Sequence, residues 1–303
     1  MSVAEKSTRI ALCGLGPMGA PIAERIVRSG TALTVWNRTD GRSATLSDLG
    51  ATIAATPSQA AAPIVLTVLP DLAQVEEIVW RDDGLLAGWV AREIADPVLV
   101  IHGTTSPVST AIFAQRMRED YGIIVLDAPL SGGTVGAAAG SLSIMVGGDA
   151  AHALALEPLF RAYGRVIRHF GPAGSGALAK ACNQVVVAST VAAISESLAL
   201  AERAGLDPAA LIGILEGGLA SSEVLRQKKS KWLEDDYMEG GSAANQLKNL
   251  RFVRESAESL AIELPVTDAV RTLFARMVER GDGELDHTGV IRTLREGRSD
   301  GHD

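Results

Sequence analysis

Three polar side chains in the second half of the chain have the spacing of one helix face and the chemistry of a proton-transfer site. Lys180, Asn183 and Gln184 stand at positions i, i+3 and i+4. Their neighbours are small or apolar, so an ammonium group at position 180 would lose hydration and its pKa would fall toward the range useful for proton transfer. A lone lysine on a helix is more often a solvated surface residue. We therefore interpret Lys180 as a candidate general acid and base only in combination with other motifs.

A glycine-rich turn near the N-terminus follows an expected strand at 9–13 and precedes an expected helix at 18–29. The first glycine of such a turn permits the bend, the second lets the backbone approach a pyrophosphate, and the third allows helix and strand to pack closely. A purely structural turn is the alternative, but the strand-turn-helix context favours dinucleotide binding. The residues of this turn are Gly14, Leu15, Gly16, Pro17, Met18 and Gly19.

The end of the second expected strand indicates which dinucleotide binds. An acidic residue there would bind the adenosine ribose of NAD, but this chain has Asn37, Arg38 and Thr39. Without a carboxylate to repel a 2'-phosphate, and with Arg38 able to hold it, the sequence favours NADP, with NAD as the alternative. Arg38 as an ordinary surface arginine is the competing interpretation.

Two further groups of residues follow expected strands, at the sheet edge where open α/β folds bind ligands. Leu69, Pro70 and Thr104 are candidates for the lining of the cofactor cleft. Ser131, Gly132 and Gly133 offer a hydroxyl and successive backbone N–H groups, which suit a substrate carboxylate. Ordinary turn glycines are the alternative for this segment.

The elements that must position these residues fall into two regions. Residues 1–172 alternate short apolar runs with helical stretches, which predicts a Rossmann-type α/β domain with a parallel sheet covered on both faces. From 173 to 303 no convincing strand appears, so we predict an all-helical second domain, in which Asp207 caps a helix that begins at Pro208.

Composition narrows the class of protein. The chain has 303 residues, a formal net charge of -8 and 4% aromatic residues, which disfavours nucleic acid as a partner. Cys13 and Cys182 are expected to be reduced core residues, and the five histidines form no metal set. The apolar run at 185–204 carries interrupting charges and is interpreted as a buried helix, not a membrane span. With no signal peptide apparent, we expect a cytoplasmic protein.

Four motifs in one order, namely the dinucleotide turn, the segment at 127–133, the segment at 171–184 and Leu247–Leu250, resemble the β-hydroxyacid dehydrogenase family. That family includes 3-hydroxyisobutyrate dehydrogenase and tartronate semialdehyde reductase, and the resemblance covers essentially the whole chain. It implies an NAD(P)-dependent oxidoreductase that interconverts a small 3-hydroxy acid and its semialdehyde. It also implies a helical domain like that of 6-phosphogluconate dehydrogenase, through which family members form dimers or larger assemblies.

The resemblance assigns roles residue by residue. It implies Lys180 as the catalytic acid and base, and Ser131, Gly132 and Gly133 as the carboxylate site. Asn183 and Gln184 match residues that orient the substrate, while Thr104 and Lys248 match cofactor contacts. Two positions depart from the family pattern: Asn249 lacks the carboxylate of the usual aspartate, which would help hold its helix or Lys248, and Gln184 stands where other members carry asparagine. The glutamine favours a small polar semialdehyde.

Two other functions fit the same architecture. An imine reductase is one, although such enzymes usually carry a different residue at the position of Lys180. A non-catalytic NADP-binding protein is the other, and the presence of Lys180 and Ser131 disfavours it.

Overall fold

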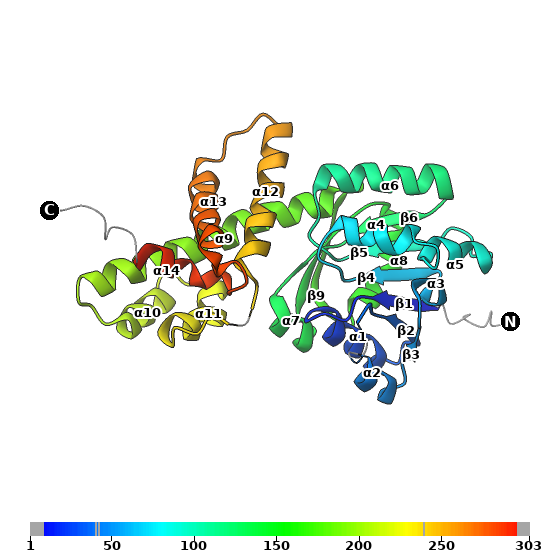
Figure 1. Ribbon diagram of the computed structural model, residues 1–303, viewed down its shortest axis with the longest axis horizontal. Helices are drawn as coiled ribbons and strands as arrows, with labels where there is room; N and C mark the ends of the chain where they lie inside the picture. Colours follow the sequence, from blue (N-terminus) through cyan, green and yellow to red (C-terminus); the bar gives the residue numbers. More distant parts are fainter. Residues whose placement is uncertain (1–8, 40, 42, 239, 296–303) are drawn as a thin grey trace. The chain divides into compact units, whose positions relative to one another are not determined.

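The computed structural model in Figure 1 describes residues 9–39, 41, 43–238 and 240–295. The chain divides into two compact units, Met1–Lys180 and Ala181–Asp303. The first unit contains every strand found in the described residues, and the second is built from helices. This confirms the predicted fold class.

The sheet of the first unit runs in the order β3-β2-β1-β4-β5-β6-β8-β7, with β9 paired to β8. The pairs from β3 through β6 are parallel, as predicted, but β8 runs antiparallel to β6 and β7. The sheet is thus mainly parallel, and its direction reverses at β8 because the chain returns from β6 through β7 and α7 without a long crossover. The strands are β1 (Ile10–Cys13), β2 (Leu33–Trp36), β3 (Thr52–Ile53), β4 (Ile64–Thr67), β5 (Val98–Ile101), β6 (Ile124–Asp127), β7 (Leu130–Ser131), β8 (Leu142–Gly147) and β9 (Gly164–Gly171).

Helices cover both faces of this sheet because alternate residues of each central strand point to opposite sides. In β1, Ile10 and Leu12 enter one apolar core, whereas Ala11 and Cys13 enter the other. The thiol of Cys13 is buried as predicted, and burial raises its pKa to about 12. The helices are α1 (Gly19–Arg28), α2 (Ala44–Asp48), α3 (Pro57–Ala60), α4 (Leu72–Trp80), α5 (Leu85–Ala91), α6 (Pro107–Tyr121), α7 (Gly133–Ala139) and α8 (Ala150–Phe160).

The long helix α9 (Ser175–Arg203) supplies Ala188, Val191 and Leu198 to the core of the second unit. It is long and apolar enough to cross a membrane by length and composition, and 44% of its most apolar window is buried inside the protein. The predicted capping of α10 by Asp207 is confirmed, since its carboxylate accepts from the Ala209 N–H at 3.0 Å. The other elements are α10 (Pro208–Gly217), α11 (Glu223–Leu233), α12 (Ala243–Ser259), α13 (Pro265–Met277), the π-helix η1 (Val278–Asp282), the 3-10 helix η2 (His287–Gly289) and α14 (Val290–Arg295).

One prediction about the second cysteine is wrong. Cys182 is exposed, not a core residue, and both cysteines are free thiols. Position 182 lies two residues beyond buried Lys180, which places it about 200° around the helix and so on a different face.

Candidate active site

The glycine turn between β1 and α1 has the backbone geometry that a dinucleotide requires. Gly14 has φ of +102°, and a Cβ at this position would lie against the Val68 carbonyl. A Cβ at Gly19 would overlap the Gly14 carbonyl, so helix and strand pack as closely as the third glycine of the motif allows. A Cβ at Gly16, by contrast, would have no atom of the described residues within 4 Å. The open side at Gly16 fits a pyrophosphate.

Asn37 ties the end of β2 to this turn. Its Oδ1 accepts from the Leu15 N–H at 2.8 Å, and its Nδ2 donates to the Thr39 carbonyl at 2.8 Å. The side chain of Asn37 therefore holds the loop in place. Arg38 is exposed, and within the described residues its guanidinium makes no hydrogen bond or ion pair. An available cation thus stands beside the turn.

The loops after β4 and β5 meet at the same edge of the sheet. A Cβ at Gly14 would touch the Leu69 side chain, and one at Gly103 would overlap the Leu69 carbonyl. Pro70 follows Leu69 in the loop after β4, and Thr104, which is half-buried, follows Gly103 directly. The structure thus brings the predicted cofactor contacts of the first unit to one place, because parallel strands end together.

The predicted carboxylate site lies at the end of β7. Ser131 is half-buried and pairs across the sheet with Ser143. Gly132 and Gly133 have φ of +128° and +63°, conformations that side chains disfavour, and Gly133 begins α7. The left-handed backbone explains why two glycines follow the serine at this turn.

Asp127 is a residue to which the sequence analysis gave no role. It ends β6, is completely buried, and accepts from the backbone N–H groups of Gly174 and Ala177 at 2.8 and 2.7 Å. Burial raises the pKa of its carboxyl, and the backbone hydrogen bonds oppose that shift. Asp127 thereby holds the first turn of α9, and Lys180 lies one turn farther along the same helix. Its place in the motif at 127–133 was the one signal that could have identified it.

Lys180 has the environment predicted for it. The side chain is 8% exposed, and burial lowers its pKa from 10.5 to about 8. No hydrogen bond or ion pair engages its ammonium group among the described residues, so nothing except solvation opposes deprotonation. A neutral amine is therefore accessible near physiological pH.

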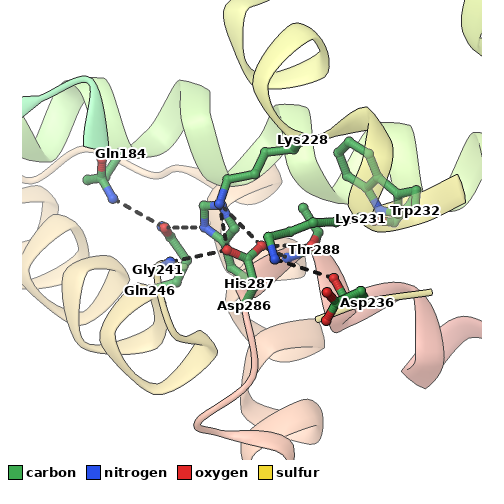
Figure 2. Close-up of polar contacts among 11 residues, drawn as sticks. Gln184, Lys228, Lys231, Trp232, Asp236, Gly241, Gln246, Asp286, His287 and Thr288 are labelled. Atoms are coloured by element: carbon green, nitrogen blue, oxygen red, sulfur yellow. Dashed lines mark hydrogen bonds and ion pairs between the residues drawn. The ribbon is translucent and has the colours of Figure 1, made fainter. Parts of the chain in front are cut away.

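The predicted residues of the second unit lie on α9 and α12. Gln184 is buried and donates from Nε2 to Oε1 of Gln246 at 3.2 Å, as Figure 2 shows. Asn183 and Lys248 are half-buried, and the Lys248 Nζ lies 6.0 Å from the centre of the Phe252 ring. Asn249, which replaces the family's aspartate, is buried, and its Oδ1 has no hydrogen-bond partner in the described part of the chain.

His102, which follows β5, is a buried histidine with a structural role. His102 donates from Nδ1 to the Ala128 carbonyl at 2.6 Å, its Nε2 lies 2.9 Å from the Tyr163 hydroxyl, and burial lowers its pKa to about 4. Because a carbonyl only accepts, Nδ1 carries the proton and Tyr163 donates to Nε2. Among the described residues, no group of three or more His, Cys, Asp and Glu side chains could hold a metal ion.

Comparisons with known proteins agree with this geometry. Residues 9–171 match the family model of the NAD binding domain of 6-phosphogluconate dehydrogenase, and residues 174–294 match that of NADP-dependent 3-hydroxyisobutyrate dehydrogenase. The chain is 36% identical to 2-hydroxy-3-oxopropionate reductase of Escherichia coli over 292 residues, 94% of this chain and 97% of that one. It is 34% identical to NAD-dependent L-serine dehydrogenase of Pseudomonas aeruginosa, over 93% of this chain and 96% of that one.

A solved structure shows the same likeness. The structure of Mycobacterium tuberculosis 3-hydroxyisobutyrate dehydrogenase with L-serine aligns with a TM-score of 0.81 at 28% identity, covering 95% of this chain and 99% of that one. The chain belongs to the β-hydroxyacid dehydrogenase family. It is an NAD(P)-dependent oxidoreductase.

Proposed function

We propose that the protein interconverts a small 3-hydroxy acid and its semialdehyde, with Lys180 as general acid and base and NADP as the preferred cofactor. The observation that carries the proposal is the buried amine of Lys180, whose pKa falls to about 8 and which no described side chain engages. The named relatives, a semialdehyde reductase and a serine dehydrogenase, support a small carboxylate substrate.

In the proposed mechanism each residue has one task. When bound, the nicotinamide ring accepts hydride from, or returns it to, the carbon that bears the hydroxyl. Neutral Lys180 accepts the hydroxyl proton during oxidation, and its ammonium form donates a proton to the developing alkoxide during reduction. Ser131, Gly132 and Gly133 bind the carboxylate and fix the orientation of the reacting carbon. Asn183 and Gln184 orient the substrate.

The cofactor fits residues of the first unit. The glycine turn at 14–19 would hold the pyrophosphate, since Gly16 has an open side and the first turn of α1 carries no acidic residue. Leu69, Pro70 and Thr104 would line the cleft, and Lys248 would contact the dinucleotide from α12. Asn37 and Thr39 would shape the adenosine end, where Arg38 binds the 2'-phosphate.

The preference for NADP leads to a test at Arg38. We expect Arg38→Ala to raise the KM for NADP about tenfold or more and to change the KM for NAD less than about twofold, because only NADP carries the phosphate that the guanidinium holds. Steady-state kinetics with both cofactors measure this. Arg28→Ala is the matched control, since Arg28 is an exposed arginine of α1 that pairs with Glu24. Equal changes for both cofactors would refute a phosphate clamp at Arg38.

We also propose that residues 1–172 form the dinucleotide-binding domain and that the helical region 173–303 serves substrate binding and oligomerisation. The protein is then a cytoplasmic homo-oligomer. Exposed apolar side chains on α9 and α10 support the assembly: Leu200 of α9 is 73% exposed and Ile214 of α10 is 75% exposed. We expect Ile214→Glu to shift a dimer or larger assembly to monomers in light scattering, while Leu154→Glu on α8 leaves the mass unchanged. A monomeric wild-type protein would overturn this part of the proposal.

A further inference from the structure

Gln184, Gln246 and His287 form a hydrogen-bonded line within the helical unit, which Figure 2 shows running from α9 through α12 to η2. The Gln184 Nε2 and the His287 Nδ1 each lie 3.2 Å from the same oxygen, Oε1 of Gln246. Gln184 and Gln246 are 6% and 4% exposed. The side-chain carbonyl of Gln246 therefore accepts two hydrogen bonds, and one of them holds the Gln184 amide in place.

An ion pair holds the segments that carry this line. The Asp286 carboxylate is completely buried and accepts from Lys228 Nζ at 2.5 Å and from the Gly241 N–H at 3.1 Å. It also accepts from the Thr288 hydroxyl at 2.7 Å. These bonds join α11, the loop before α12 and η2. His287 also faces this carboxylate, since its Nε2 lies 4.0 Å from Asp286 Oδ1. The line itself consists of two amides, Gln184 and Gln246, and the His287 imidazole.

The line has hydrogen-bonding capacity that the protein does not use. Within the described residues, the hydrogen bond found at the Gln184 amide is the one that its Nε2 donates. Gln246 Nε2 is buried without a partner in that same part of the chain. A buried polar group left in this state costs about 1–3 kcal/mol, which a ligand that completes the bonds would recover. Gln184 lies four residues after Lys180 on α9, so the two side chains are neighbours on one helix face.

We propose that Gln246 is a specificity-determining positioning residue, which holds the Gln184 amide for a neutral hydrogen-bonding substituent, a hydroxyl or an amine, on C2 of the substrate. This inference rests on the proposed function, in which Lys180 acts at C3 and Ser131 with its glycines binds the carboxylate. A methyl group at C2 would leave the amide unsatisfied. Sites built to bond a polar group discriminate strongly against the analogue that lacks it, so the substrate class is a 2-hydroxy or 2-amino-3-hydroxy acid.

Glycerate and 3-hydroxyisobutyrate test this directly, because they differ only by hydroxyl or methyl at C2. With both enantiomers of each, we expect the wild-type kcat/KM to favour glycerate by at least about tenfold. Gln246→Met should lower that preference about tenfold, because kcat/KM for glycerate falls. The kcat/KM for 3-hydroxyisobutyrate should change less than about twofold. Gln246→Glu keeps an acceptor for the Gln184 Nε2 and should retain most of the preference.

The controls separate specificity from folding. Gln227→Met alters an exposed glutamine of α11 that donates a hydrogen bond to Glu223, and we expect it to leave kcat/KM for both acids unchanged. The KM for NADP should stay constant in all variants. A wild-type enzyme that prefers 3-hydroxyisobutyrate overturns the inference alone, as does a Gln246→Met variant that slows both acids equally. A wild-type enzyme that oxidises neither acid, nor any other 3-hydroxy acid, overturns the proposed function and this inference with it.

Discussion

Lys180→Met is expected to lower kcat about a thousandfold while the dissociation constant for NADP stays within about twofold of the wild-type value, because general acid and base catalysis contributes about 10²–10⁴ in rate. Lys180 has no described partner that could take over the proton. Stopped-flow or steady-state turnover and fluorescence titration of the cofactor measure the two quantities. Retained turnover would move the acid and base role to another residue.

The pH dependence gives the same prediction a second readout. With a pKa of about 8 for Lys180, kcat/KM for oxidation should rise with pH and level off above about 8, since the neutral amine is the base. For reduction it should fall as pH rises through about 8, because the ammonium form is the acid. Lys180→Met should remove both the rise of kcat/KM for oxidation and its fall for reduction. Lys231→Met, the same exchange at a lysine of α11, should leave both profiles unchanged.

Removal of this amine should also stabilise the protein. The folded pKa lies below that of the unfolded chain, so the charged form is penalised in the folded state at every pH below about 8, and the penalty disappears as pH rises through about 10.5. A shift from 10.5 to about 8 corresponds to about 3 kcal/mol. Lys180→Met should therefore raise the Tm at pH 7 and much less at pH above about 10. An unchanged Tm at both pH values would contradict burial of the charge.

Asp127→Asn is expected to destabilise the protein by about 3 kcal/mol and to lower kcat about tenfold or more, since removing one side of a buried charged hydrogen-bond set leaves the other side unsatisfied. An amide presents a donor to one of the two N–H groups that the carboxylate now binds, at Gly174 or Ala177. Gly147 and Gly176 pack against Asp127 so closely that the helix start has little room to adjust.

The matched control is Asp149→Asn. Asp149 caps α8 by the same kind of bond, from the His152 N–H at 3.0 Å, but it is exposed. We expect it to cost at most about 1 kcal/mol of the free energy of unfolding and to leave kcat unchanged. Urea unfolding and steady-state kinetics measure both variants. If the two substitutions lower kcat equally, Asp127 does not position Lys180.

Interactions between residues close in sequence were predictable. The turn at 14–19 depends on glycines that are neighbours along the chain, and the capping of α10 by Asp207 spans two residues. The alternation of apolar residues in β1 likewise follows from strand geometry. Such features need no partner from elsewhere in the chain, so their residue types and spacing suffice to predict them.

The amino-acid sequence by itself determined the fold class, the dinucleotide turn and the choice of Lys180 as the candidate base. Only the tertiary structure decided which buried groups surround these residues: Asp127 meets the start of α9 across 47 and 50 positions, and Gln184 meets Gln246 across 62. It also decided the antiparallel direction of β8 and the exposure of Cys182. These outcomes depend on packing between segments far apart in the chain, and one-dimensional spacing carries no information about which distant groups meet.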